Sequence, residues 1–157
     1  MRKTIKSVLV ALIAVVATMS IAPAAQATGE GFEGCTPGYW KNHTDNWEEA
    51  SPGEIFGDRF DQARANVAGL TFLQTLQGGG GKGLDGAAKI LARAATAAWL
   101  NAAHDGAGYP WRRHMEGLEG RPPLLDTVNA AFASNDRDTM LALATRLDND
   151  NNLGCPF

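Results

Sequence analysis

Apolar residues recur every three or four positions along much of the chain, and this spacing predicts helices. One stripe begins at Phe60 and continues to Leu76, with a break or kink expected at Gly69. A denser one covers about 85–104, where alanine-rich sequence presents a broad apolar face. Alanine is the best helix former, and its small side chain lets neighbouring helices approach closely. This segment is predicted to be the central helix, with Asp85 as its cap.

Two more helices are expected in the last third of the chain. One begins at Pro122-Pro123 and runs through Ala133, and the other is capped by Ser134 or Asn135. No segment shows the strict alternation of apolar and polar residues that marks a strand. The pattern therefore predicts an all-α fold, a small bundle of four to five helices.

A long N-terminal loop is expected to precede these helices. Residues 29–57 are rich in Gly, Pro, Asn, Asp and Thr, which favour turns. Within this stretch, 51–54 (Ser-Pro-Gly-Glu) has the composition of a helix start, with Ser as the cap and Pro at the first helical position.

The first 27 residues have the pattern of a signal peptide. Basic residues precede an unbroken run of ten apolar residues, 8–17, and Ala25-Gln26-Ala27 supplies a small-x-small cleavage pattern. The run is too short to span a bilayer, which needs about 20 residues. We therefore expect 1–27 to be a signal peptide and 28–157 to be one extracellular domain. The expected location is secreted or extracellular, or periplasmic if the host is Gram-negative.

The charge balance argues against two kinds of partner. Residues 1–27 hold three of the 14 basic residues and none of the 17 acidic ones, which leaves 28–157 with a formal charge of −6. Such a surface disfavours nucleic acid and anionic membranes. No further apolar stretch approaches spanning length, so no membrane insertion is expected.

The two cysteines, Cys35 and Cys155, lie near the ends of the expected domain. In an oxidising compartment they most simply pair with each other. Closing so long a loop contributes about 4–5 kcal/mol in the chain-entropy description. Free thiols, metal ligation and an intermolecular bridge are the alternatives. The disulfide would make the N-terminal segment a clasp that holds the chain ends together.

Nothing in the sequence has the pattern of a known catalytic motif. The only serines after residue 27, Ser51 and Ser134, lie at predicted helix caps, and there is no G-x-S-x-G elbow. No H-E-x-x-H or C-x-x-C motif occurs either. No cofactor is predicted. A metal ion bound by His43 and His104, with Asp45 or Asp105, is the alternative.

Five aromatic residues in predicted loops are candidate ligand contacts. Their rings could stack on a cell-envelope glycan or protein, or they could pack against the disulfide as core. For Trp40 the packing role is favoured, whereas Tyr109 and Trp111 are the expected contact surface. The five are Tyr39, Trp40, Trp47, Tyr109 and Trp111.

Several stretches together resemble a module of secreted and surface-associated bacterial proteins. They are CTPGYWKNH, the GGGG and LNAAH stretches, VNAAFAS and the terminal NNLGCP. The resemblance implies an extracellular bacterial setting, and it marks five signature positions without assigning roles: Cys35, Trp40, His43, His104 and Cys155. The expected function is a secreted binding or surface-matrix module without catalytic machinery. The alternative is a small metal-binding protein or metal-dependent enzyme that uses His43 and His104.

Overall fold

Seven α-helices and two 3₁₀ turns make up the described part of the chain, residues 33–104 and 107–157, in the computed structural model. No strand occurs in these two ranges, where strand-like pairing is limited to two isolated bridges. The all-α prediction is confirmed. The predicted signal peptide lies outside the described residues. The helices are α1 (Pro37–Asn42), α2 (Phe56–Arg59), α3 (Ala65–Ala68), α4 (Phe72–Gln77), α5 (Gly83–Asn101), α6 (Leu124–Ala133) and α7 (Arg137–Asn151).

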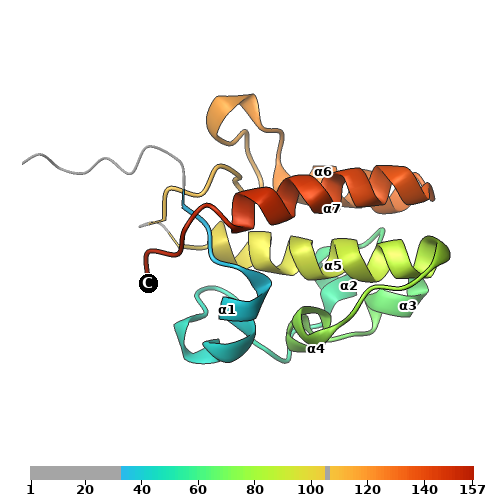
Figure 1. The fold of residues 1–157 in the computed structure, drawn as a ribbon, viewed down its shortest axis with the longest axis horizontal. Coiled ribbons are helices and arrows are strands. Elements are labelled where there is room, and N and C mark those ends of the chain that lie inside the picture. Colours follow the sequence, from blue (N-terminus) through green and yellow to red (C-terminus); the bar gives the residue numbers. More distant parts are fainter. Residues whose placement is uncertain (1–32, 105–106) are drawn as a thin grey trace, which may run out of the picture.

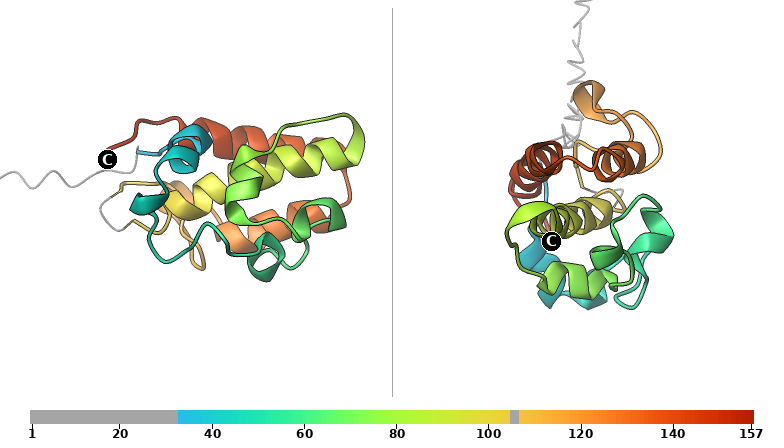
Figure 2. Two further views of the ribbon diagram at one scale, coloured as in Figure 1. Left: turned by 90° about the horizontal axis from the view of Figure 1, so that it is seen from below. Right: turned by 90° about the vertical axis from the view of Figure 1, so that its right-hand side faces the viewer.

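Helix α5 lies at the centre of the molecule. Figure 1 and the end-on view in Figure 2 show α6 and α7 on one side of it and the four short helices α1 to α4 on the other. Of its 19 residues, 13 are buried, so the helix is covered nearly all round. Most of these residues are alanines, whose small side chains allow α7 and α4 to pack closely against α5. The predicted central helix is confirmed.

Helix α5 begins slightly earlier than its sequence suggested. Its N-cap is Lys82, and Asp85 lies in the first turn instead of capping it. An acidic side chain there still interacts favourably with the helix dipole. The glycine-rich loop 78–83 passes so close that a Cβ at Gly86 would collide with the backbone of Gly81. Glycine at 86 is therefore required by packing.

The stripe from Phe60 to Leu76 starts at the C-cap of α2 and then forms two short helices, α3 and α4, instead of one long helix. The break falls at Gly69, where a kink was expected, and Thr71 then starts α4 afresh with a capping box made with Gln74. Residues 51–54 form a turn ahead of α2. Similarly, α7 is capped by Asp136, whose side chain accepts from the Thr139 backbone N–H at 2.7 Å, and not by Ser134 or Asn135.

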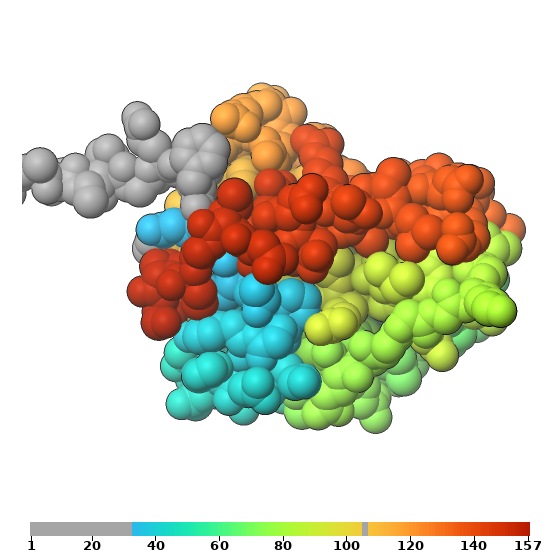
Figure 3. Space-filling view, viewed as in Figure 1, coloured from blue at the N-terminus to red at the C-terminus, as the bar shows by residue number. Residues whose placement is uncertain are grey.

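The N-terminal segment contains a short α-helix and a 3₁₀ turn where a long loop was expected. Thr36 caps α1 by accepting from the Tyr39 N–H, and Pro37 occupies the first helical position. A 3₁₀ turn, Thr44–Asn46, follows directly. The Thr-Pro-Gly sequence has the composition of a turn, but the same residues also start helices. In Figure 3 this segment lies beside the C-terminal residues.

None of the helices in the two described ranges is long and apolar enough to cross a membrane.

Candidate binding site at the disulfide clasp

The two ends of the described chain are joined by the disulfide Cys35–Cys155, as the cysteine positions predicted. The Cα atoms lie 4.4 Å apart across a sequence separation of 120. Beside the bond, the Gly34 N–H donates to the Gly154 carbonyl oxygen at 2.8 Å. A Cβ at Gly34 would collide with the backbone of Asp150, so the close approach of the two segments requires glycine there. We call residues 33–48, held by this bond, the clasp.

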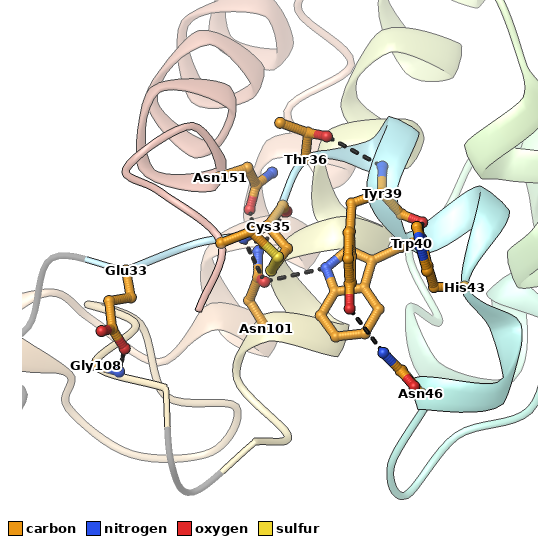
Figure 4. Close-up of a disulfide and its surroundings, with 11 residues drawn as sticks. Glu33, Cys35, Thr36, Tyr39, Trp40, His43, Asn46, Asn101, Gly108 and Asn151 are labelled. Carbon is orange, nitrogen blue, oxygen red and sulfur yellow. Dashed lines mark hydrogen bonds between the residues drawn. A yellow bond between two sulfur atoms is a disulfide. The ribbon is translucent and has the colours of Figure 1, made fainter. Parts of the chain in front are cut away.

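A buried amide, Asn101 at the end of α5, anchors the clasp (Figure 4). Its Oδ1 accepts from the Cys35 backbone N–H at 2.8 Å and from the Trp40 indole N–H at 3.0 Å. Its Nδ2 donates to the Cys35 carbonyl at 2.9 Å and to Oδ1 of Asn151 at 2.9 Å. All its donors and acceptors are engaged without solvent. Sequence analysis missed Asn101; its signal was a polar residue inside the apolar face of the predicted central helix.

The network continues from Asn101 into α7. Asn151 is also buried, and its Nδ2 donates to the Ala94 carbonyl at 3.1 Å. The Tyr109 hydroxyl donates to Asn151 Oδ1 at 2.7 Å. Burial, with the carboxylate of Asp150 nearby, raises the pKa of Tyr109 well above its ordinary value, so the phenol remains a neutral donor. These bonds tie α5, α7 and the loop after α5 to the clasp.

Three of the five candidate aromatic contacts are core residues. Trp40, Tyr109 and Trp111 each have no exposed surface. Trp40 packs in one cluster with Cys35, which confirms its expected packing role. The expectation that Tyr109 and Trp111 form a contact surface is wrong. The Trp111 N–H donates to Asp150 Oδ2 at 2.7 Å, so the loop after α5 is anchored by rings whose polar atoms bind within the protein.

Tyr39 and His43 lie together on the outside of α1. Their rings stack with centroids 4.2 Å apart, and His43 Nδ1 lies 2.9 Å from the Tyr39 carbonyl oxygen. The Tyr39 hydroxyl accepts from the side chain of Asn46 at 2.7 Å. His43 is the C-cap of α1, and its backbone N–H also donates to the Tyr39 carbonyl. These contacts fix the shape of the turn that follows α1 (Figure 4).

A pocket of about 380 Å³ opens beside this turn, and we call it the clasp pocket. One part of its wall is Trp47, a half-buried ring whose N–H donates to the Trp40 carbonyl at 2.9 Å. Of the five candidate aromatic contacts, Trp47 is the one that lines it. Phe157, which sequence analysis did not single out, is 47% exposed and lines it as well. The lining residues are Asp45, Asn46, Trp47, Glu48, His104 and Phe157.

His104 is a largely enclosed side chain of the clasp pocket, with 9% of its side-chain surface exposed. Its ring lies between Trp40 and Phe157, with centroid distances of 5.2 and 4.5 Å. Nδ1 is 3.4 Å from Glu48 Oε1. Nε2 is buried and has no hydrogen-bond partner among the described residues. A polar atom in this state carries a cost in free energy that a hydrogen-bonding partner would recover.

The metal alternative has little geometric support in residues 33–104 and 107–157. No group of three or more His, Cys, Asp or Glu side chains converges there as a metal site would require. His43 stacks on Tyr39, and His104 faces Glu48 within the clasp pocket. Asp45 lines that pocket too, while Asp105 lies outside the described residues.

A larger groove, of about 540 Å³, lies between α1, α5 and α7. Its walls include alanines and the exposed side chains of Ile90, Arg93 and Asp148, and no aromatic ring contributes to it. The clasp pocket combines aromatic rings with charged groups, and this is the composition by which proteins orient a small ligand. Comparisons of the chain with protein-family models, with curated proteins and with solved structures gave no match.

Proposed function

We propose that this protein is a secreted, non-catalytic binding module that attaches to extracellular or cell-envelope glycan through the clasp pocket. The observation that carries the proposal is a pair of partly exposed rings, Trp47 and Phe157, on the walls of one pocket beside the disulfide. Aromatic rings that remain accessible in a concave site are typical contacts for the apolar faces of sugars.

The closed disulfide supports the proposed location. Disulfides such as Cys35–Cys155 form and persist in oxidising compartments outside the cytosol. The signal-peptide pattern of residues 1–27 and the resemblance to a secreted bacterial module favour the same setting. A metal function for His43 and His104 would need a group of three or more converging ligands, and no such group occurs among the described residues.

Weak contacts fit a protein that works on a repetitive surface. One ring on one ligand contributes about 0.5–1.5 kcal/mol beyond area burial, so a single site would bind weakly. Many copies on an insoluble polymer would still be retained, since rebinding to neighbouring sites raises the effective concentration.

Co-sedimentation of the secreted, oxidised protein with insoluble polymers tests the proposal. Suitable polymers are chitin, insoluble chitosan, cellulose and bacterial peptidoglycan. Phe157→Ala is expected to reduce retention at least fivefold on whichever polymer the wild type binds, with an unchanged melting temperature because the ring is half exposed. Met115→Ala, another exposed apolar side chain outside the pocket lining, is the matched control. Equal retention of wild type and Phe157→Ala, or no retention on any polymer, would refute the proposal.

A further inference from the structure

The charge of the clasp pocket points to the class of ligand. Asp45 and Glu48 contribute two carboxylates, and no lysine or arginine lines the pocket. The ion pairs of the described residues leave both acids without a lysine or arginine partner, whereas the neighbouring Glu49 is bound by Arg113 at 2.7 Å. These two acids are therefore available to a cation from solution.

The aromatic walls of the clasp pocket also suit a cationic ligand. The Trp47 N–H is already donated to Trp40, so the indole offers its ring and not a hydrogen bond. Phe157, which lines the same pocket, offers a half-exposed phenyl ring. An aromatic face attracts an ammonium or guanidinium group and also packs on aliphatic C–H groups. A ligand with a cationic group on an apolar frame would use both properties.

His104 is a second and independent sign of a ligand. This side chain lines the pocket with 91% of its surface buried, and it meets Glu48 through Nδ1 alone. Its Nε2 has no partner among the described residues. Buried polar atoms in proteins almost always have a partner, either in the protein or in bound water or ligand. A ligand would reach this nitrogen only if the His104 ring turned within the clasp pocket, because the atom has almost no accessible surface.

We propose that the clasp pocket binds the protonated amino group of an amino sugar, with the sugar ring against Trp47 and the ammonium group near Asp45 and Glu48. This rests on the proposed function and names the ligand class for the same site. A volume of about 380 Å³ is near the lower end of the roughly 300–1,000 Å³ of ligand pockets. One or two sugar rings fill such a space. An N-acetylated sugar lacks the positive charge and has fewer donors to offer to the carboxylates.

Titration calorimetry of the full secreted protein with a glucosamine tetramer and its fully N-acetylated counterpart tests this inference. The free-amine tetramer is expected to bind at least tenfold more tightly, and added salt should weaken it because the contacts are ionic. Asp45→Asn and Glu48→Gln should each reduce its affinity by about fivefold or more. Asp138→Asn, the same chemical change on an exposed acid at the far end of α7, should leave the affinity within twofold of wild type.

Three results would overturn the amino-sugar inference. The first is equal affinity for the acetylated and free-amine tetramers, and the second is equal effects of Asp45→Asn and Asp138→Asn. The third is tighter binding of a lysine tetrapeptide than of the glucosamine tetramer, which would assign the pocket to polypeptide. If insoluble polymer retains the protein through Phe157 in the sedimentation assay while the free amine makes no difference, the binding function stands and only the ligand class fails. If neither tetramer binds and no polymer retains the protein, both proposals fail.

Discussion

Replacing Asn101 by alanine should destabilise the protein more than any other single polar substitution among the described residues. The amide makes four hydrogen bonds, to both backbone groups of Cys35, to the Trp40 indole and to Asn151. All of these groups lie in the interior. Alanine removes the bonds and leaves the partner groups buried.

The size of the effect follows from these bonds. A typical hydrogen bond contributes about 1 kcal/mol net, which gives about 4 kcal/mol for four. Water that enters the vacated space would restore part of this, while the unpaired Trp40 N–H and the backbone groups of Cys35 add to the cost. We expect a loss of about 3–4 kcal/mol in the free energy of unfolding. This is a large share of the roughly 5–15 kcal/mol that holds a domain folded.

Urea unfolding of the oxidised protein, followed by helical circular dichroism, measures this loss. With a slope of about 1.5 kcal/mol per molar urea, the urea midpoint of Asn101→Ala should fall by about 2–2.7 M. The control is Asn149→Ala on α7, where the side chain is exposed and the expected change is within about 0.5 kcal/mol. A loss below about 1 kcal/mol for Asn101→Ala would refute the view that the buried amide holds the clasp.

Two further stability predictions concern the same region. Trp40→Ala removes a fully buried ring from the cluster with Cys35 and should cost about 3–5 kcal/mol in urea unfolding, with loss of much of the helical signal at 37 °C; a loss below about 1 kcal/mol would contradict it. Cys35→Ser should lower the free energy of unfolding by about 2–5 kcal/mol. Intact mass of the wild type under alkylating conditions should show no modified thiol before reduction and two after it, and two alkylated cysteines in the unreduced native protein would contradict the bond.

Periodicity and cysteine chemistry carried the prediction of the fold. The alanine-rich stretch marked α5, and the spacing of apolar residues marked α6 and α7. The pairing of Cys35 with Cys155 followed from their isolation at the two ends. The helix starts were less predictable, since Ser134, Asn135 and Asp136 are all good capping residues and tertiary packing selects one of them.

The site was harder to predict because burial of aromatic loops depends on partners far away in sequence. Tyr109 and Trp111 lie in a segment with the composition of a turn, yet their polar atoms bind Asn151 and Asp150, about 40 residues later. Trp47 is a tryptophan in a loop, as Trp111 is, and it remains partly exposed. Only the tertiary fold distinguishes these cases.

Because the groups that hold the clasp are buried and the groups proposed to bind ligand are exposed, loss of binding can be told apart from loss of stability. Asn101, Trp40 and the disulfide hold the clasp from inside, so changes there should unfold it and remove binding together. Phe157 and the two acids lie on the pocket walls with exposed surface, so changes there should remove binding alone. A pocket whose walls are held by a disulfide and a buried amide needs little reordering when a ligand arrives. Such preorganisation lowers the entropy cost of binding, which matters most for a site whose individual contacts are weak.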